Sequence, residues 1–262
     1  MSNNDVSSNL ISYEYPLNER MRTFLRLEYL FAQYQFGAAG QTTWHTRAAV
    51  SALLDVMSLL SRSDIRSELQ KELDRLSQSL SNLQKQPQVD AALLQPVLEE
   101  CKDLSQRLRS APTGIPAIVR NSEFLATIEQ RAGVLGGTCA FDLAGYHLWL
   151  ESPVSERQKR LAEWHGAFTL IDAGSAFILR MLRGSADPAA ETAQNGTFQA
   201  TLDHTTPYQL LRVLLEKSRN CYPEISGSKH FCNIRFLEQP QQGERPQQVR
   251  DDIPFTLERC VI

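Results

Sequence analysis

The sequence has few cysteines, and their spacing fits no common framework. Five occur among 262 residues, at positions 101, 139, 221, 232 and 260. An odd number at scattered spacings fits neither a set of disulfides nor a zinc site of paired CxxC knuckles. We therefore expect free, reduced thiols and no structural metal.

Long apolar runs and an export signal are also missing. The first ten residues, MSNNDVSSNL, lack the basic start and apolar stretch of a signal peptide. The most apolar long segment, AFTLIDAGSAFILRML, is interrupted by Asp172 and Arg180 and is shorter than the ~20 residues that cross a bilayer. These features predict a cytoplasmic chain without a membrane span.

A basic surplus and the common catalytic motifs are absent too. The formal net charge is −3 and the pI is about 6.0, which argues against a general nucleic-acid binder because phosphate binding depends on excess positive charge. The chain contains no GxGxxG, GxxxxGK[ST], HExxH or GxSxG. No cofactor is therefore predicted.

Two weak constellations keep chemical alternatives open. Cys139, Asp142 and His147 lie close in sequence, and an imidazole can activate a thiolate, so a cysteine-dependent hydrolase using Cys139 and His147 is one alternative. A small buried Cys139 is the simpler interpretation. His230 and Cys232 would share one face of a strand, but two ligands are too few for a structural metal site.

Apolar periodicity predicts several helices in the first two thirds of the chain. They cover about 18–34, 42–60, 64–83, 94–109 and 117–131, and a further helix runs from about 153 to 184, where Gly166 or Gly174 could mark a break. Residues 64–109 are predicted to form a long antiparallel hairpin. Its apolar seams should pack on each other; contact with a second subunit is the alternative.

After residue 190 the period changes to two. Strands are expected at 197–203, 209–216, 229–238 and 253–259, although 209–216 could be helical; Tyr222-Pro223 and Ser226-Gly227 are expected to be turns. The predicted class is α+β, with a helical domain at 17–190 and a small, mostly antiparallel β-sheet domain at 191–262. A short strand at 11–15 is expected to join that sheet.

Arginines near aromatic residues suggest a binding surface. In YPLNERMRTFLRLEYL, residues 15–30, Arg22 and Arg26 lie one helical turn apart, where like charges cost roughly 0.2–0.5 kcal/mol unless an anion lies beside them. The other candidates are Arg62, Arg66, His147, Lys229 and Arg235. For any one of them, a solvated face or an internal salt bridge is the plainer interpretation.

Five segments, in this order, resemble one family along most of the chain. They are PLNERMRTFLRLEYL, LLDV, DIRSELQKELDR, GGTCAFDLAGYHLWL and YPEISGSKHFCNIRF. Together they are similar to the ZapD family, bacterial cell-division factors associated with the tubulin-like GTPase FtsZ.

The resemblance implies a protein without enzymatic activity. It implies a homodimer that binds the C-terminal tail of FtsZ and bundles FtsZ filaments at the midcell division ring, with basic residues receiving the tail. Matching positions include Arg22, Arg26, His147 and Arg235. Glu123 and Phe231 replace basic residues of the family and are not carried over. A structural protein that binds partners through its helical hairpin is a further alternative.

Overall fold

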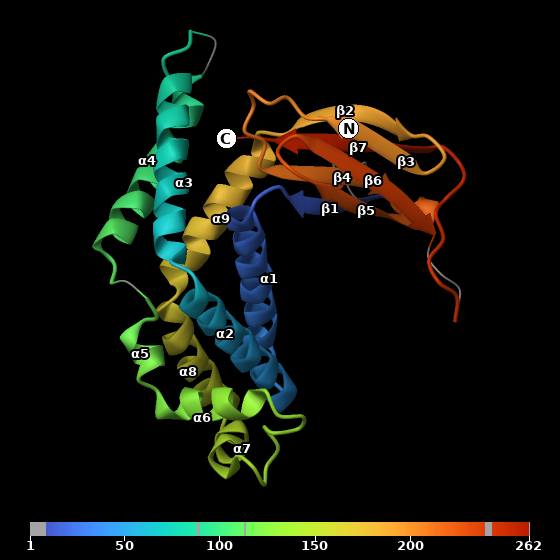
Figure 1. Cartoon of the computed structure of the whole chain (residues 1–262). Helices are drawn as coiled ribbons and strands as arrows, with labels where there is room; N and C mark the ends of the chain where they lie inside the picture. Colours follow the sequence, from blue (N-terminus) through green and yellow to red (C-terminus); the bar gives the residue numbers. More distant parts are fainter. Residues whose placement is uncertain (1–8, 88–89, 113, 239–242, 262) are drawn as a thin grey trace, which may run out of the picture. The chain divides into compact units, whose positions relative to one another are not determined.

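The chain folds into two compact units. The computed structural model describes residues 9–87, 90–112, 114–238 and 243–261, so the polar start at 1–8 lies outside the described residues. One unit, here called the strand unit, comprises Met1–Thr23 with Leu179–Ile262; the other, the helical unit, comprises Phe24–Ile178. Helices and antiparallel strands confirm the α+β class (Figure 1). The expected division near residue 190 falls within a strand, β2.

The described residues form the following elements. The α-helices are α1 (Glu19–Ala39), α2 (Thr43–Arg62), α3 (Ile65–Leu83), α4 (Ala91–Ser110), α5 (Ala117–Arg120), α6 (Glu123–Ala132), α7 (Ala144–Leu150), α8 (Val154–Gly166) and α9 (Thr169–Gly184). The strands are β1 (Leu10–Pro16), β2 (Asp187–Ala193), β3 (Thr197–Thr201), β4 (Leu210–Glu216), β5 (Cys221–Gly227), β6 (Phe231–Glu238) and β7 (Ile253–Cys260).

The helix starts follow from side-chain caps. The Thr42 hydroxyl accepts from the backbone N–H of His45 at 3.3 Å, and Asp64 Oδ1 accepts from that of Ser67 at 3.1 Å. Bonds from the hydroxyl and N–H of Ser67 hold the pKa of the Asp64 carboxyl below its ordinary value. Both starts agree with the sequence pattern.

The predicted hairpin is confirmed as α3 and α4. Arg66, at the start of α3, bonds to the carbonyl of Leu108 near the end of α4, while Gln84 and Gln95 pair at the opposite end. The helices are therefore antiparallel. The predicted helix 153–184 is divided into α8 and α9, which meet just after Gly166.

Helices α1 and α2 approach each other closely at Gly37. A Cβ atom there would lie 2.6 Å from both the backbone nitrogen of Ala49 and the carbonyl oxygen of His45. Any side chain would therefore force the backbones apart. The glycine lets α2 return along α1 after a short loop.

A buried arginine fastens that loop to the rest of the helical unit. Arg157, on α8, is 5% exposed, and its Nη1 donates to the hydroxyl of Thr46 at 2.7 Å. Its Nη2 and Nε donate to the carbonyl oxygens of Gln41 (2.9 Å) and Ser152 (3.2 Å). These bonds satisfy the donors of a guanidinium group that has little contact with water, and they tie α8 to the α1–α2 loop.

The strands form two antiparallel sheets, where the sequence suggested one. Their orders are β1-β4-β7-β2 and β3-β6-β5. One apolar core contains residues of both, among them Val213 of β4, Leu257 of β7 and Phe236 of β6. Two sheets that share a core explain why period-two alternation holds on both.

Two strands were missed in the sequence because they contain proline. Residues 221–227 form β5 and not turns, and Pro188 lies within β2. Both strands lie at a sheet edge, where a residue without an N–H leaves no central ladder bond unmade. Residues 209–216, left open between helix and strand, contain β4.

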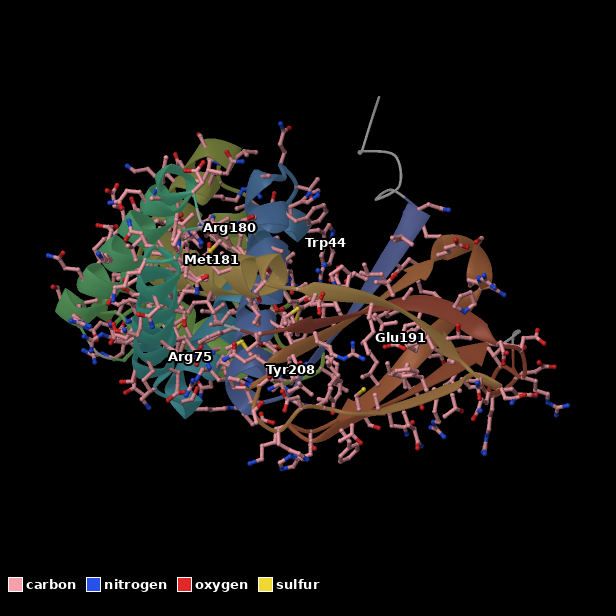
Figure 2. The ribbon with its side chains drawn as sticks, turned by 90° about the horizontal axis from the view of Figure 1, so that it is seen from above. Trp44, Arg75, Arg180, Met181, Glu191 and Tyr208 are labelled. Carbon is pink, nitrogen blue, oxygen red and sulfur yellow. The ribbon has the colours of Figure 1, made fainter. Side chains whose placement is uncertain are left out.

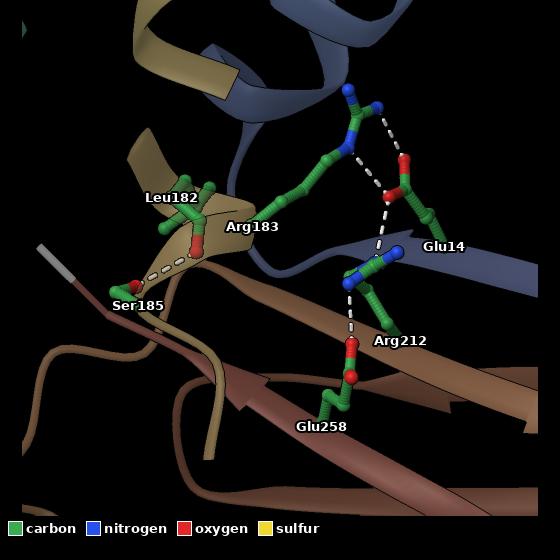
Figure 3. A network of polar contacts seen from close by, with 6 residues as sticks. All are labelled: Glu14, Leu182, Arg183, Ser185, Arg212 and Glu258. Carbon is green, nitrogen blue, oxygen red and sulfur yellow. Dashed lines mark hydrogen bonds and ion pairs between the residues drawn. The ribbon is translucent and has the colours of Figure 1, made fainter. Parts of the chain in front are cut away.

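An ion network joins the end of α9 to three strands (Figure 3). Arg183 donates from Nε to Oε1 and from Nη2 to Oε2 of Glu14 on β1, each at 2.7 Å. Arg212 on β4 bonds to the same carboxylate at 3.0 Å and also to Glu258 on β7. These four charges are therefore engaged within the strand unit.

We expect Arg157→Ala to lower the free energy of unfolding by about 2–4 kcal/mol, because it removes the hydrogen bonds to Thr46, Gln41 and Ser152 and leaves a cavity at a buried position. Arg107→Ala is the matched control, since that exposed side chain pairs along its own helix with Asp103. It should change stability by less than about 0.5 kcal/mol. Urea unfolding followed by circular dichroism measures both, and equal effects would contradict the role of Arg157.

Candidate binding site

A groove between α1 and α2 brings two predicted site residues together. Arg26, in the second turn of α1, and Arg62, the last residue of α2, both line a cavity of about 330 Å³. They are 36 positions apart in sequence and meet because α2 runs back along α1. The cavity is lined by Arg26, Tyr29, Leu30, Asp55, Ser58, Leu59 and Arg62.

The two guanidinium groups are exposed and available. Within the described part of the chain, no hydrogen bond or ion pair engages the guanidinium group of Arg26 or of Arg62. Tyr29 is 69% exposed beside them. Asp55 also lines the groove, and partial burial raises the pKa of its carboxyl group above the ordinary value. The groove therefore suits a ligand that offers carboxylates and an apolar side chain.

Arg22, one turn earlier on α1, is partly neutralised. Its Nε lies 3.3 Å from a carboxylate oxygen of Glu19 but makes no hydrogen bond of normal geometry there. Because both side chains are substantially exposed, such a pair is worth at most about 1 kcal/mol. A carboxylate ligand could replace Glu19 at small cost.

Arg66 has a structural use instead. Its Nε and Nη2 donate to the carbonyl oxygens of Leu108 and Arg109 at 2.6 and 2.7 Å. Both carbonyls lie in the last turn of α4, so Arg66 closes the base of the hairpin. A ligand would have to compete with both bonds.

His147 lies on the exposed side of α7 next to Leu148, which is 75% exposed. Its neighbour Trp149 belongs to an aromatic cluster with Phe124 and Trp164, at ring-centroid distances of 5.5 and 5.6 Å. The packing of Trp149 in this cluster fixes the position of α7, which carries His147. His147 does not line the α1–α2 groove described above.

Sequence reasoning did not single out Trp44, an exposed aromatic residue of the helical unit. Trp44 is 77% exposed and is labelled in Figure 2. The Arg47 guanidinium carbon lies 5.6 Å from the Trp44 ring centroid and 4.9 Å from that of Tyr146. A tryptophan next to a helix cap was the available signal, since aromatic residues with arginine are typical of interfaces.

The remaining basic candidates belong to the strand unit. Lys229 is exposed between β5 and β6, and Arg235 on β6 pairs with Glu224 on β5 at 2.6 Å. Both partners of that pair are 52% exposed, so water screens their attraction. Phe231 is itself 52% exposed at the start of β6.

The proposed thiol–imidazole pair is not assembled. The Cys139 thiol donates to the Asp142 carboxylate at 3.4 Å, and no hydrogen bond joins Cys139 to His147 among the residues that the structure describes. In the same part of the chain, no three His, Cys, Asp or Glu side chains are placed to hold a metal ion. None of the described helices combines the length and the hydropathy of a membrane span.

The helical unit with its basic groove and the two-sheet strand unit define an α+β protein with a candidate surface for an acidic ligand. A family model described as "ZapD: Cell division protein" matches residues 25–235. The chain is 44% identical over 254 residues to a protein of Methylococcus capsulatus named "Cell division protein ZapD", covering 97% of this chain and 99% of that one. Proteins of the same name from Nitrosomonas europaea and Azoarcus sp. are 36% and 35% identical, over 99% and 97% of this chain and 98% and 100% of their own.

The chain therefore belongs to the ZapD family, and its role is in cell division. The family resemblance seen in the sequence is confirmed.

We predict that iodoacetamide at pH 8 modifies Cys139 first in the folded protein. The other four thiols are buried, and burial raises the pKa of Cys101 to about 11 and of Cys260 to about 12, so these remain protonated and unreactive at pH 8. Peptide mass spectrometry after short labelling measures the order. Early labelling of Cys101 or Cys260 would contradict this burial, and Cys139→Ser is the control.

Proposed function

We propose that this protein binds the C-terminal tail of FtsZ and cross-links FtsZ filaments at the division ring. The observation that carries the proposal is the α1–α2 groove, where the guanidinium groups of Arg26 and Arg62 are exposed and unbonded within the described residues. FtsZ as the partner rests on the family resemblance. The groove supplies a physical receptor for an acidic chain end.

The groove can recognise both the charge and the apolar side chains of a peptide. Guanidinium groups bind carboxylates in a bidentate way, and Leu30, Leu59 and the exposed ring of Tyr29 offer apolar contact between the two arginines. Arg22 can join once its weak pair with Glu19 opens. Charges at this exposure are screened within about 8–10 Å at moderate salt, so binding should weaken as salt rises.

Lys229, Arg235 and His147 are further basic candidates on other elements. Arg235 is held against Glu224 and Lys229 is exposed nearby in sequence, so the strand unit offers cations of its own. Arg66 is the weakest member of the set, because its hydrogen bonds to Leu108 and Arg109 close the hairpin. We therefore assign it to positioning α4.

Bundling follows if the protein is a homodimer. A twofold dimer presents each groove twice, so it can hold tails from two filaments, and repeated weak contacts along a filament add through effective concentration. Neither step requires a cofactor or catalysis. Under this proposal the protein acts in the cytoplasm at midcell and is not an enzyme.

Charge reversal in the groove tests the receptor. We expect Arg26→Glu and Arg62→Glu each to weaken binding of the FtsZ tail peptide by at least about tenfold, which is 1.4 kcal/mol, because each replaces attraction with repulsion. Fluorescence anisotropy of a labelled tail peptide measures the affinity, and thermal melting checks the fold. Arg107→Glu, which makes the same charge change on the exposed face of α4, should bind normally.

The tail itself is tested by light scattering of FtsZ with GTP. Addition of this protein should raise scattering with full-length FtsZ and not with FtsZ that lacks its tail. Equal scattering by both would contradict tail recognition. If both groove variants still bind the tail peptide, Lys229 and Arg235 become the candidate receptor. Charge reversal at these two positions is then the next comparison.

The helical hairpin remains the second candidate surface. Leu83 near the end of α3 and Leu93 near the start of α4 are 41% and 76% exposed, so this end of the hairpin has apolar side chains in contact with water. Alanine at both positions should leave tail-peptide binding unchanged if the groove is the receptor. A loss of tail binding in that variant would favour the hairpin.

A further inference from the structure

Two histidines of the strand unit face each other across adjacent turns. His204 follows β3, and His230 immediately precedes β6. Their Nδ1 atoms lie 2.7 Å apart, and the ring centroids are separated by 4.7 Å with the planes at 53°. Both side chains are exposed.

The backbone keeps these two turns together. The N–H of Leu202 donates to the carbonyl oxygen of His230 at 2.8 Å, and the N–H of Ser228 donates to that of Phe231 at 2.9 Å. The N–H of His230 donates to the Ser228 hydroxyl at 3.2 Å. The imidazoles are therefore held close by main-chain bonds that do not depend on the contact between the rings.

The separation of the two nitrogens is close to that of a chelate. Zinc–imidazole bonds are about 2.0–2.1 Å long, so two ligand nitrogens at an angle of roughly 90–110° lie about 2.9–3.4 Å apart. Opening the present contact by about half an ångström is enough. Exposed side chains on turns can make this adjustment through small χ rotations.

The neighbouring charges favour a cation on balance. The Asp203 carboxylate lies beside His204 in sequence and accepts hydrogen bonds from the N–H and hydroxyl of Thr205 and from the hydroxyl of Thr206, so it supplies negative charge next to the pair. Lys229 precedes His230 and has the opposite effect. Its ammonium group is exposed, where water and salt screen it.

We propose that His204 and His230 form a two-imidazole binding site for a divalent transition-metal ion of the Zn²⁺ class. Imidazole nitrogen selects such ions over Mg²⁺ and Ca²⁺, which prefer oxygen ligands. Two protein ligands leave positions for water, so the site binds exchangeably. This agrees with the finding that the described residues hold no cluster of three or more candidate ligands. The inference does not depend on the function proposed above.

The pairing differs from the one suggested by the sequence. His230 and Cys232 were expected on one strand face, but Cys232 is 1% exposed in the core while His230 lies outside β6. That pair is therefore not a ligand set. The true neighbour of His230 is 26 positions away.

Isothermal titration of untagged protein with ZnCl₂ tests the site. All proteins carry Cys139→Ser, which removes the most accessible thiol as a competing ligand. We expect one saturable ion per chain, with affinity reduced at least about tenfold in both His204→Ala and His230→Ala, since a direct ligand should matter at least as much as an outer-shell partner. His147→Ala, which removes an exposed histidine of the helical unit, is the control and should bind normally.

The proposal is overturned if the parent protein shows no saturable binding at micromolar Zn²⁺, or if either His204→Ala or His230→Ala binds as tightly as the parent. Thermal melting of both variants without metal checks that they are folded.

Discussion

The close packing of α2 along α1 is the constraint on which the candidate site depends. Gly37 permits the approach, because a Cβ there would lie 2.6 Å from backbone atoms of the next helix. Arg157 then secures the loop between the two helices through hydrogen bonds to Gln41 and Thr46. Only with α2 held in this way does its last residue, Arg62, share a groove with Arg26.

The arginines of the protein divide according to what already binds them. Arg157 and Arg66 donate to backbone carbonyls within the helical unit, and Arg183 is held by Glu14 in the strand unit. Their charges serve the fold. Arg26 and Arg62 have no bonded partner within the described residues. A ligand that binds them must therefore offset the free energy needed to remove water from these side chains and to order them. Whether a cationic side chain can bind a ligand depends on the bonds that it already makes within the protein. Its position in a basic segment of the sequence is a weaker guide.

Much of the fold follows from local pattern, and its failures have a local cause. The 3.6-residue period predicted α1 to α4 because this signal acts within a few turns of chain, and the capping bonds of Thr42 and Asp64 are equally local. Strands β2 and β5 were missed since Pro188 and Pro223 usually interrupt strands. A strand tolerates such a proline when it lies at the edge of a sheet, and that position is a property of the whole sheet.

The sequence by itself determined the α+β class, the helical hairpin, the turn-by-turn spacing of Arg22 and Arg26 and the resemblance to the ZapD family. Tertiary structure alone decided that Arg62 joins Arg26, that Arg66 is used within the hairpin, and that His204 meets His230. Local spacing fixes which residues share a helix face. Contacts between residues far apart in sequence depend on the loops and packed cores that bring their segments together. A periodic pattern in the sequence does not specify this arrangement.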